Sequence, residues 1–279
     1  MSPSSAPIIL ATGGTGGHMF PAQALAHVLM ERGYRLVLIT DSRGDSYGGM
    51  LGGLERHKIR AAGISGRGLL ARAGALFQLG LGLVQARRLL KKLKPSVAIG
   101  FGGYPAIPTM VAAGQLRIKT VIHEQNAVLG RANRVLAPRA DRIATGFPRL
   151  AKLRDADRER SVLTGNPVRP EIVAVGGHPY AAPTPGGPVN LLVIGGSQGA
   201  AIFSEVVPAA LASLSEASRK RLNVVQQCPG DTAGGVRAVY EAAGIVAELA
   251  PFFKDIPARL SEAHLLICRA GASTIAELT

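Results

Sequence analysis

The amino-acid sequence predicts an α/β fold made of two doubly wound, Rossmann-like domains. Short apolar runs alternate with segments of helical periodicity along most of the chain, as in parallel sheets that helices cover on both faces. A glycine-rich loop follows an apolar run twice, at residues 13–17 and again at 195–199. Apolar residues make up 47% of the chain and aromatic residues only 4%, which suits layered α/β cores.

The first half of the chain reads as strands separated by helices. We expect strands at 8–12, 35–40, 59–62, 96–100, 119–123 and 141–145, the last of these closing the first sheet. We expect helices at 20–32, 74–93, 105–114 and 128–138. Strands linked through helices in this way form a parallel sheet.

A change of composition marks a boundary near residue 166. Residues 165–170 are rich in turn formers, and 176–188 are dense in glycine and proline. The strand–glycine loop–helix pattern then restarts, with strands expected at 190–194, 222–227, 245–248 and 264–268. Helices are expected at 202–214, 232–243, 255–262 and from 273. We therefore divide the chain into domains 1–166 and 167–279.

The first glycine loop predicts an anion site. It joins the apolar strand at 8–10 to a helical segment, so backbone N–H groups and a helix N-terminus point at whatever binds there. It lacks the Lys-Ser or Lys-Thr of a Walker A loop, and Met19 stands where a dinucleotide fingerprint needs glycine. His18 closes the loop and reads equally well as a general base or phosphate donor and as a half-buried hydrogen-bonding residue.

Polar residues also follow other predicted strands. Since ligands bind at the carboxyl ends of parallel strands, we expect these residues to gather at binding sites, although each could simply cap a helix or form a turn. They are Gly102, Gly103 and Tyr104; His123, Glu124, Gln125 and Asn126; Ser197 and Gln198; and Arg269, Gly271, Ser273 and Thr274.

The charge is unevenly distributed. Residues 1–150 hold 20 Lys and Arg against 6 Asp and Glu, whereas residues 151–279 hold 12 of each, so the net charge of +14 comes from the first half. This asymmetry indicates an anionic partner, although a basic solvated surface is the plainer explanation. The two cysteines have no disulfide or zinc spacing, and we expect no metal site, signal peptide or transmembrane helix.

Residues 69–94 combine many apolar side chains with flanking cations. The cations are Arg72, Arg87, Arg88, Lys91, Lys92 and Lys94. We expect 83–93 to be a core helix with a basic outer face. Glycines should interrupt the helix in 69–81, where Leu76, Phe77 and Leu79 are expected to contact an anionic membrane surface.

With these motifs set out, the chain resembles the N-acetylglucosaminyltransferase family of peptidoglycan synthesis. The matching runs are ATGGTGGHMFPAQALA, GFGGYPAIP, HEQNAVLGRANR, TGNPVR, GGSQGA and CRAGASTIAEL, in the family's order and over nearly the whole chain. The resemblance implies the glycosyltransferase B fold, in which two domains face a cleft. It also implies inverting transfer of GlcNAc from UDP-GlcNAc to the MurNAc C4 hydroxyl of lipid I, giving lipid II, with no cofactor or essential metal.

The resemblance assigns roles to particular residues. The acceptor diphosphate would face Gly13, Gly14, Gly102, Gly103 and Tyr104, and UDP-GlcNAc would contact Thr15, Gly16, Gly17, Asn126, Arg169, Ser197, Phe253, Arg269, Thr274 and Glu277. Inverting transfer also needs a base for the attacking hydroxyl, and on chemical grounds we expect His18 to be the catalytic base, with Glu124 behind it. Domain 1–166 would bind lipid I and the cytoplasmic face of the bacterial inner membrane peripherally, and domain 167–279 would bind the donor.

The chain departs from the family's pattern at three places. Phe253 stands where Ile is frequent, and Ala106 stands where Ser is usual. The family continues past Thr279 with a paired-glutamine donor motif and a C-terminal helix, so we expect the sequence to be a truncated form.

Two alternatives remain open from the residues alone. A dinucleotide-dependent oxidoreductase would use Asp41, at the end of the second strand, to bind ribose. A basic nucleic-acid-binding protein would use the charge, but the chain has neither an aromatic RNA-binding pattern nor zinc-finger spacing, so we expect no nucleic-acid partner.

Overall fold

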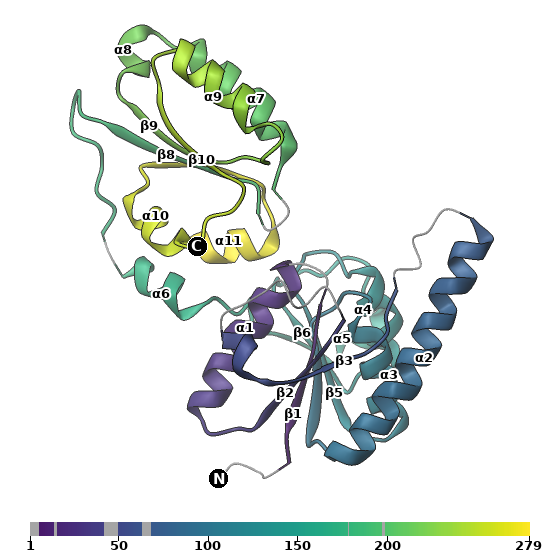
Figure 1. Cartoon of the computed structure of the whole chain (residues 1–279). Coiled ribbons are helices and arrows are strands. Elements are labelled where there is room, and N and C mark those ends of the chain that lie inside the picture. Colours follow the sequence, from purple (N-terminus) through teal and green to yellow (C-terminus); the bar gives the residue numbers. More distant parts are fainter. Residues whose placement is uncertain (1–5, 14–15, 42–49, 63–67, 178, 197–198) are drawn as a thin grey trace. The chain divides into compact units, whose positions relative to one another are not determined.

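The structure is a computed structural model that describes residues 6–13, 16–41, 50–62, 68–177, 179–196 and 199–279. The chain forms two compact units, Met1–Arg169 and Pro170–Thr279 (Figure 1). Both are parallel sheets with helices on their faces, so the predicted α/β class with two doubly wound domains is confirmed.

The described part of the first unit contains a seven-stranded parallel sheet in the order β3-β2-β1-β4-β5-β6-β7. The strands are β1 (Ile8–Ala11), β2 (Leu36–Thr40), β3 (Glu55–Lys58), β4 (Val97–Gly100), β5 (Lys119–Glu124), β6 (Arg142–Thr145) and β7 (Ser161–Leu163). The α-helices are α1 (Gly16–Glu31), α2 (Leu69–Leu93), α3 (Ala106–Gln115), α4 (Arg131–Leu136) and α5 (Asp155–Arg158), and 3₁₀ turns lie at Met50–Gly53 and Ala137–Arg139.

The central strand β1 is buried on both faces, as its apolar run predicts. Ile9 and Ala11 pack in one core cluster with residues of α2 and α3, whereas Ile8 and Leu10 pack with residues of α1 on the opposite face. This burial holds the loop after β1 at the carboxyl edge of the sheet.

The two edge strands differ from the prediction. Strand β3 lies at residues 55–58 rather than 59–62, and the strand at 141–145 is not the last, because β7 follows it. Both edge strands are short and largely exposed, and β3 has the polar sequence ERHK. Apolar runs reveal buried strands and therefore miss such edges.

Helix α2 runs without interruption from Leu69 to Leu93, so the expectation that glycines break it was wrong. Packing explains a further glycine of this helix, Gly82. A Cβ at Gly82 would lie 1.9 Å from the carbonyl oxygen of Arg60, so only glycine lets the helix approach that backbone this closely.

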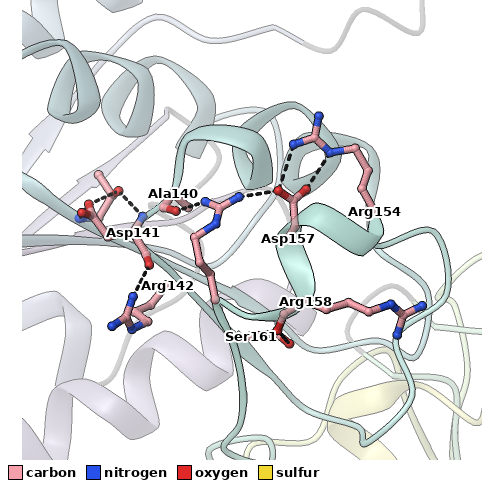
Figure 2. A network of polar contacts seen from close by, with 9 residues as sticks. Ala140, Asp141, Arg142, Arg154, Asp157, Arg158 and Ser161 are labelled. Atoms are coloured by element: carbon pink, nitrogen blue, oxygen red, sulfur yellow. Dashed lines mark hydrogen bonds and ion pairs between the residues drawn. The ribbon is translucent and has the colours of Figure 1, made fainter.

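An ion-pair network holds the end of the sheet at β6 and β7 (Figure 2). The buried carboxylate of Asp157 accepts from Arg154 Nε at 2.7 Å and Nη2 at 2.9 Å. It also accepts from Arg160, whose guanidinium donates to the Ala140 carbonyl as well. These bonds, with Arg154 the largest contribution, hold the pKa of Asp157 below its ordinary value.

The described part of the second unit contains a four-stranded parallel sheet in the order β10-β9-β8-β11. Its strands are β8 (Val189–Ile194), β9 (Leu222–Gln227), β10 (Val246–Ala250) and β11 (Leu265–Cys268). Its helices are α6 (Pro170–Gly176), α7 (Ala201–Ala212), α8 (Glu216–Arg219), α9 (Ala233–Ala242), α10 (Ile256–Glu262) and α11 (Ala272–Leu278). The short helices α6 and α8 lie in segments where no helix was expected.

Candidate functional site

Two glycine-rich loops of the first unit meet at the carboxyl ends of β1 and β4. Gly102 and Gly103 follow β4 with φ of 88° and 73°, a region that glycine enters without strain. A Cβ at Gly103 would lie 2.9 Å from the carbonyl oxygen of Gly13, and one at Gly102 would lie 3.2 Å from Cε1 of His18. The loops therefore pack against each other, and the surface that they form has no room for side chains at Gly102 and Gly103.

His18 stands at this surface on the first turn of α1. Its carbonyl accepts a hydrogen bond from Thr12 Oγ1 at 3.0 Å, which ties the start of the helix to the end of β1. Its ring is half-buried, and Nδ1 lies 3.2 Å from Oε1 of Gln125. The imidazole is thus held by a residue of the loop after β5.

Gln125 links His18 to a second histidine. Its Nε2 donates to the Phe101 carbonyl at 3.0 Å and lies 3.1 Å from Nδ1 of His123. Nε2 of His123 lies 3.1 Å from the carbonyl of Gly165. Burial lowers the pKa of His123, although the Gly165 hydrogen bond and the charge of Glu124 act in the opposite direction.

Glu124 accepts four hydrogen bonds with its two carboxylate oxygens. Oε1 accepts from the backbone N of Asn126 at 3.1 Å and from its Nδ2 at 3.0 Å. Oε2 accepts from the backbone N of Gly130 at 2.8 Å and from Nδ2 of Asn133 at 2.9 Å. The side chain is 1% exposed. Its lone pairs are occupied in shaping the loop between β5 and α4, so this geometry argues against Glu124 as the base.

A cavity of about 330 Å³ lies at the ends of β2 and β3, beside the first loop. It is lined by Asp41, by residues 58–61 and by Gln78 and Gln85 of α2. A Cβ at Gly13 would lie 3.0 Å from Oδ1 of Asp41, so Asp41 adjoins the glycine loop.

The two described ends of the second unit's glycine loop lie close together. A Cβ at Gly195 would lie 2.1 Å from the backbone N of Ala200, so the turn has no room for a side chain there. The N–H of Gly195 donates to Oε1 of Gln227 at 2.9 Å, and Nε2 of Gln227 donates to the Pro251 carbonyl at 3.1 Å. Gln227 therefore joins the loops after β8 and β10.

The other predicted donor residues of this unit lie after β10 and β11. Phe253 is buried, and the Arg259 guanidinium carbon lies 4.2 Å above its ring centroid. The Arg259 guanidinium in turn donates hydrogen bonds to carboxylate oxygens of Asp255 and Glu248. Arg269 is exposed after β11, and Thr274 and Glu277 are half-buried on α11.

The structure brings together Gly13, His18, Gly102 and Gly103, but it does not describe every predicted residue. Gly14, Thr15 and Ser197 lie outside the described residues. Gly16 is buried at the start of α1, while Gly17 and Asn126 are exposed and Tyr104 is half-buried. The guanidinium carbon of Arg169 lies 4.6 Å from the ring centroid of Phe20, within the first unit.

Three residues make the side-chain bonds that connect these loops: Gln125, Asn133 and Gln227. Gln125 was expected near a binding site but without a specific role, and no role was expected for Asn133 or Gln227. Two of the three could have been found from their positions in the sequence, because Gln125 and Gln227 stand at or just after the ends of strands. Among the described residues, no three His, Cys, Asp or Glu side chains are grouped to hold a metal ion. No helix in the described part of the chain has the length and apolarity needed to cross a membrane.

Comparison with known proteins gives consistent matches over both units. Residues 8–145 match the glycosyltransferase family 28 N-terminal domain, and residues 190–279 match the C-terminal domain of the same family. A protein of Rhodospirillum centenum is 55% identical over 276 residues, which are 99% of this chain and 73% of that protein. A protein of Paramagnetospirillum magneticum is 55% identical over 279 residues, covering 100% of this chain and 75% of its own length.

Both relatives carry the name UDP-N-acetylglucosamine--N-acetylmuramyl-(pentapeptide) pyrophosphoryl-undecaprenol N-acetylglucosamine transferase. Among solved structures, MurG of Acinetobacter baumannii superposes with a TM-score of 0.68 at 30% identity. That match covers 98% of this chain and 74% of the other.

Proposed function

The chain belongs to glycosyltransferase family 28, and from that premise we propose that it transfers GlcNAc from UDP-GlcNAc to the MurNAc C4 hydroxyl of lipid I, forming lipid II for peptidoglycan synthesis. The observation that carries this proposal is the 55% identity to a transferase named for these substrates, over 99% of the chain. The transferase assignment replaces the two alternatives that the residues alone left open, an oxidoreductase and a nucleic-acid-binding protein.

The first unit suits a lipid-linked diphosphate acceptor. The glycine loops after β1 and β4 pack closely together beside the N-terminus of α1, where the helix dipole favours an anion. The excess of 20 basic over 6 acidic residues in positions 1–150 attracts the same charge. We assign the acceptor diphosphate to Gly13, Gly14, Gly102, Gly103 and Tyr104.

The second unit suits the nucleotide-sugar. Its glycine loop leads into the N-terminus of the twelve-residue helix α7, which can face a phosphate. Arg269 is exposed and can stabilise the charge that develops on UDP as it leaves. We keep Phe253, Thr274, Glu277 and the undescribed Ser197 as donor contacts, together with Thr15, Gly16, Gly17, Asn126 and Arg169.

The reaction needs a base for the acceptor hydroxyl. His18 takes the C4 hydroxyl proton as that oxygen bonds to the anomeric carbon of GlcNAc. The bond from that carbon to the UDP oxygen breaks, and the configuration inverts. The four hydrogen bonds that Glu124 accepts support a structural role for it in the loop, so we assign this proton to His18 alone.

The proposed activity is tested by incubating the purified chain with radiolabelled UDP-GlcNAc and a soluble lipid I analogue. A labelled disaccharide product supports the proposal. A folded chain that binds UDP-GlcNAc but yields no such product would overturn the assignment of this activity to these 279 residues.

The role of His18 is tested with His18→Gln. Turnover should fall by about 10²-fold or more, the usual contribution of a general base. Turnover equal to that of the unsubstituted chain would transfer the role to another group.

We further propose that the first unit binds the cytoplasmic face of the bacterial inner membrane peripherally. Leu76 and Phe77 on the first half of α2 are 58% and 65% exposed, and Leu79 is half-buried beside them. Farther along the same helix, Arg87, Arg88, Lys91 and Lys92 are exposed. Apolar side chains together with cations suit an anionic lipid surface.

The membrane proposal is tested by sedimentation with phosphatidylglycerol vesicles. The double variant Leu76→Ser, Phe77→Ser should lose binding while retaining turnover of a soluble acceptor. Val173→Ser is the matched control, because Val173 is 62% exposed in the second unit. Equal loss of vesicle binding in the control, or retained binding in the double variant, would refute the assignment to α2.

A further inference from the structure

We propose that Gln125 is a positioning residue that selects the tautomer of His18 carrying its proton on Nδ1, so that Nε2 is left as the basic atom. The tautomer is a property of the hydrogen bonds alone. Its use in catalysis rests on the proposed function, in which His18 is the base.

The orientation of the Gln125 amide follows from its neighbours. Its Nε2 lies 3.0 Å from the carbonyl oxygen of Phe101, and a carbonyl can only accept. The amide nitrogen must therefore face Phe101, which leaves Oε1 facing Nδ1 of His18 at 3.2 Å. Because this oxygen can only accept, Nδ1 of His18 must be the donor.

His123 makes the reverse orientation of the amide unfavourable. It is 4% exposed, and burial lowers its pKa, which favours the neutral ring. Its Nε2 must donate to the Gly165 carbonyl, so its Nδ1 carries a lone pair and accepts from Nε2 of Gln125. A flipped amide would place its oxygen against this lone pair and against the Phe101 carbonyl.

The backbone of Gly102 and Gly103 packs against the His18 ring. A Cβ at Gly102 would lie 3.2 Å from Cε1 and 3.3 Å from Nδ1 of His18, and a Cβ at Gly103 would lie 3.4 Å from Cδ2. Glycine at both positions leaves room for the ring, whose Nδ1 faces Gln125. In the proposed reaction the other ring nitrogen, Nε2, takes the hydroxyl proton.

Glutamine has the chemistry that this position requires. It offers a donor to Phe101 and His123 at one end and an acceptor to His18 at the other, and it does so without charge. Leucine offers neither the donor nor the acceptor. Glutamate keeps the acceptor for His18 but loses the donor, so the two substitutions separate the bond to His18 from the bonds behind it.

The direct test is ¹⁵N NMR of the histidine rings in the full chain, with His18→Gln used to assign the His18 signals. In the unsubstituted protein the signals should report a protonated Nδ1 and an unprotonated Nε2 on His18. In Gln125→Leu, His18 should shift toward the Nε2-protonated form that free histidine favours in water. In Gln125→Glu, His18 should keep its Nδ1 proton while His123 gains one on its own Nδ1.

Kinetics supply the second readout. Gln125→Leu should lower kcat about tenfold or more, a part of what a general base contributes, with KM for UDP-GlcNAc changed less than threefold. Gln125→Glu should recover most of the lost kcat. Gln115→Leu is the matched control, because Gln115 accepts a hydrogen bond from Arg87 on the exposed surface of α3. It should change neither the His18 signals nor the kinetics.

The outcomes separate the two proposals. An Nε2-protonated His18 in the unsubstituted protein overturns the inference whatever the activity. The expected tautomer together with full activity of His18→Gln overturns the base assignment and leaves the tautomer standing. If Gln125→Leu does not fold, the spectrum of the unsubstituted protein and that of Gln125→Glu still decide the inference.

Discussion

Replacing Glu124 by Gln should destabilise the first unit, because the buried carboxylate accepts hydrogen bonds from four donors. An amide keeps one oxygen, which can satisfy the Asn126 pair or the pair from Gly130 and Asn133, but not both. Its NH₂ group then faces two donors. The substitution preserves shape and volume, so the effect isolates the second oxygen and the charge.

The expected size follows from those bonds. Two hydrogen bonds to a charged acceptor are lost, at about 1.5–3 kcal/mol each. Part of this loss is offset because the variant no longer buries a charge. We expect a net loss of about 3 kcal/mol, which at a slope of about 2 kcal/mol per molar urea lowers the unfolding midpoint by about 1.5 M.

Urea unfolding followed by far-UV circular dichroism measures this change, since the chain contains no Trp. Glu55→Gln on the edge strand β3 is the matched control. Its carboxylate also pairs with Arg35, at 2.7 Å, but both side chains are largely exposed. A surface pair of this kind contributes at most about 1 kcal/mol, so the control midpoint should move little.

The same variant also distinguishes a structural role of the Glu124 carboxylate from a role as the catalytic base. If Glu124 shapes the loop, Glu124→Gln lowers the midpoint and reduces turnover through the loss of folded or correctly shaped protein. An unchanged midpoint with abolished turnover would refute this reasoning and return Glu124 to the reaction as a base.

Two further predictions concern the stability of the first unit. Asp157→Asn should cost about 2 kcal/mol at neutral pH by weakening the bonds to Arg154 and Arg160. Because the pKa of Asp157 is lowered in the folded state, this contribution is present above about pH 4 and disappears as acid protonates the carboxylate, so the two proteins should converge in stability at low pH in urea titrations. Gly82→Ala should lower the thermal midpoint, since its Cβ would meet the Arg60 carbonyl at 1.9 Å. By contrast Gly80→Ala, with nothing within 4 Å, should raise the stability by about 0.5–1 kcal/mol, and equal midpoints for the two would refute the packing argument.

Buried elements were predictable because their signals are local. The apolar run at 8–12 and the helical pattern from 20 match β1 and most of α1. The exposed edges β3 and β7 were misplaced or missed, since a short strand paired on one side needs no apolar run. Helix α2 was expected to be interrupted in 69–81 because glycine lowers helix propensity, but it runs unbroken from Leu69 to Leu93.

The glycine loops were also predictable as candidate binding sites from a local signal, because a strand, a glycine loop and a helix follow one another directly in the sequence. The proposed order of the two candidate bases, His18 first and Glu124 behind it, was also reached from the sequence. The structure adds a physical argument for that order, because both carboxylate oxygens of Glu124 already accept hydrogen bonds.

The α/β class, the two glycine loops and the family are visible in the sequence alone, because periodicity and motif spacing are properties of neighbouring residues. The side chains that act together were found only in the folded structure. His18 and Gln125 are 107 positions apart, and Gln125 and Phe101 are 24 apart. Hydrogen bonds are set by distances in space, and parallel strands bring the ends of distant segments to one edge of a sheet.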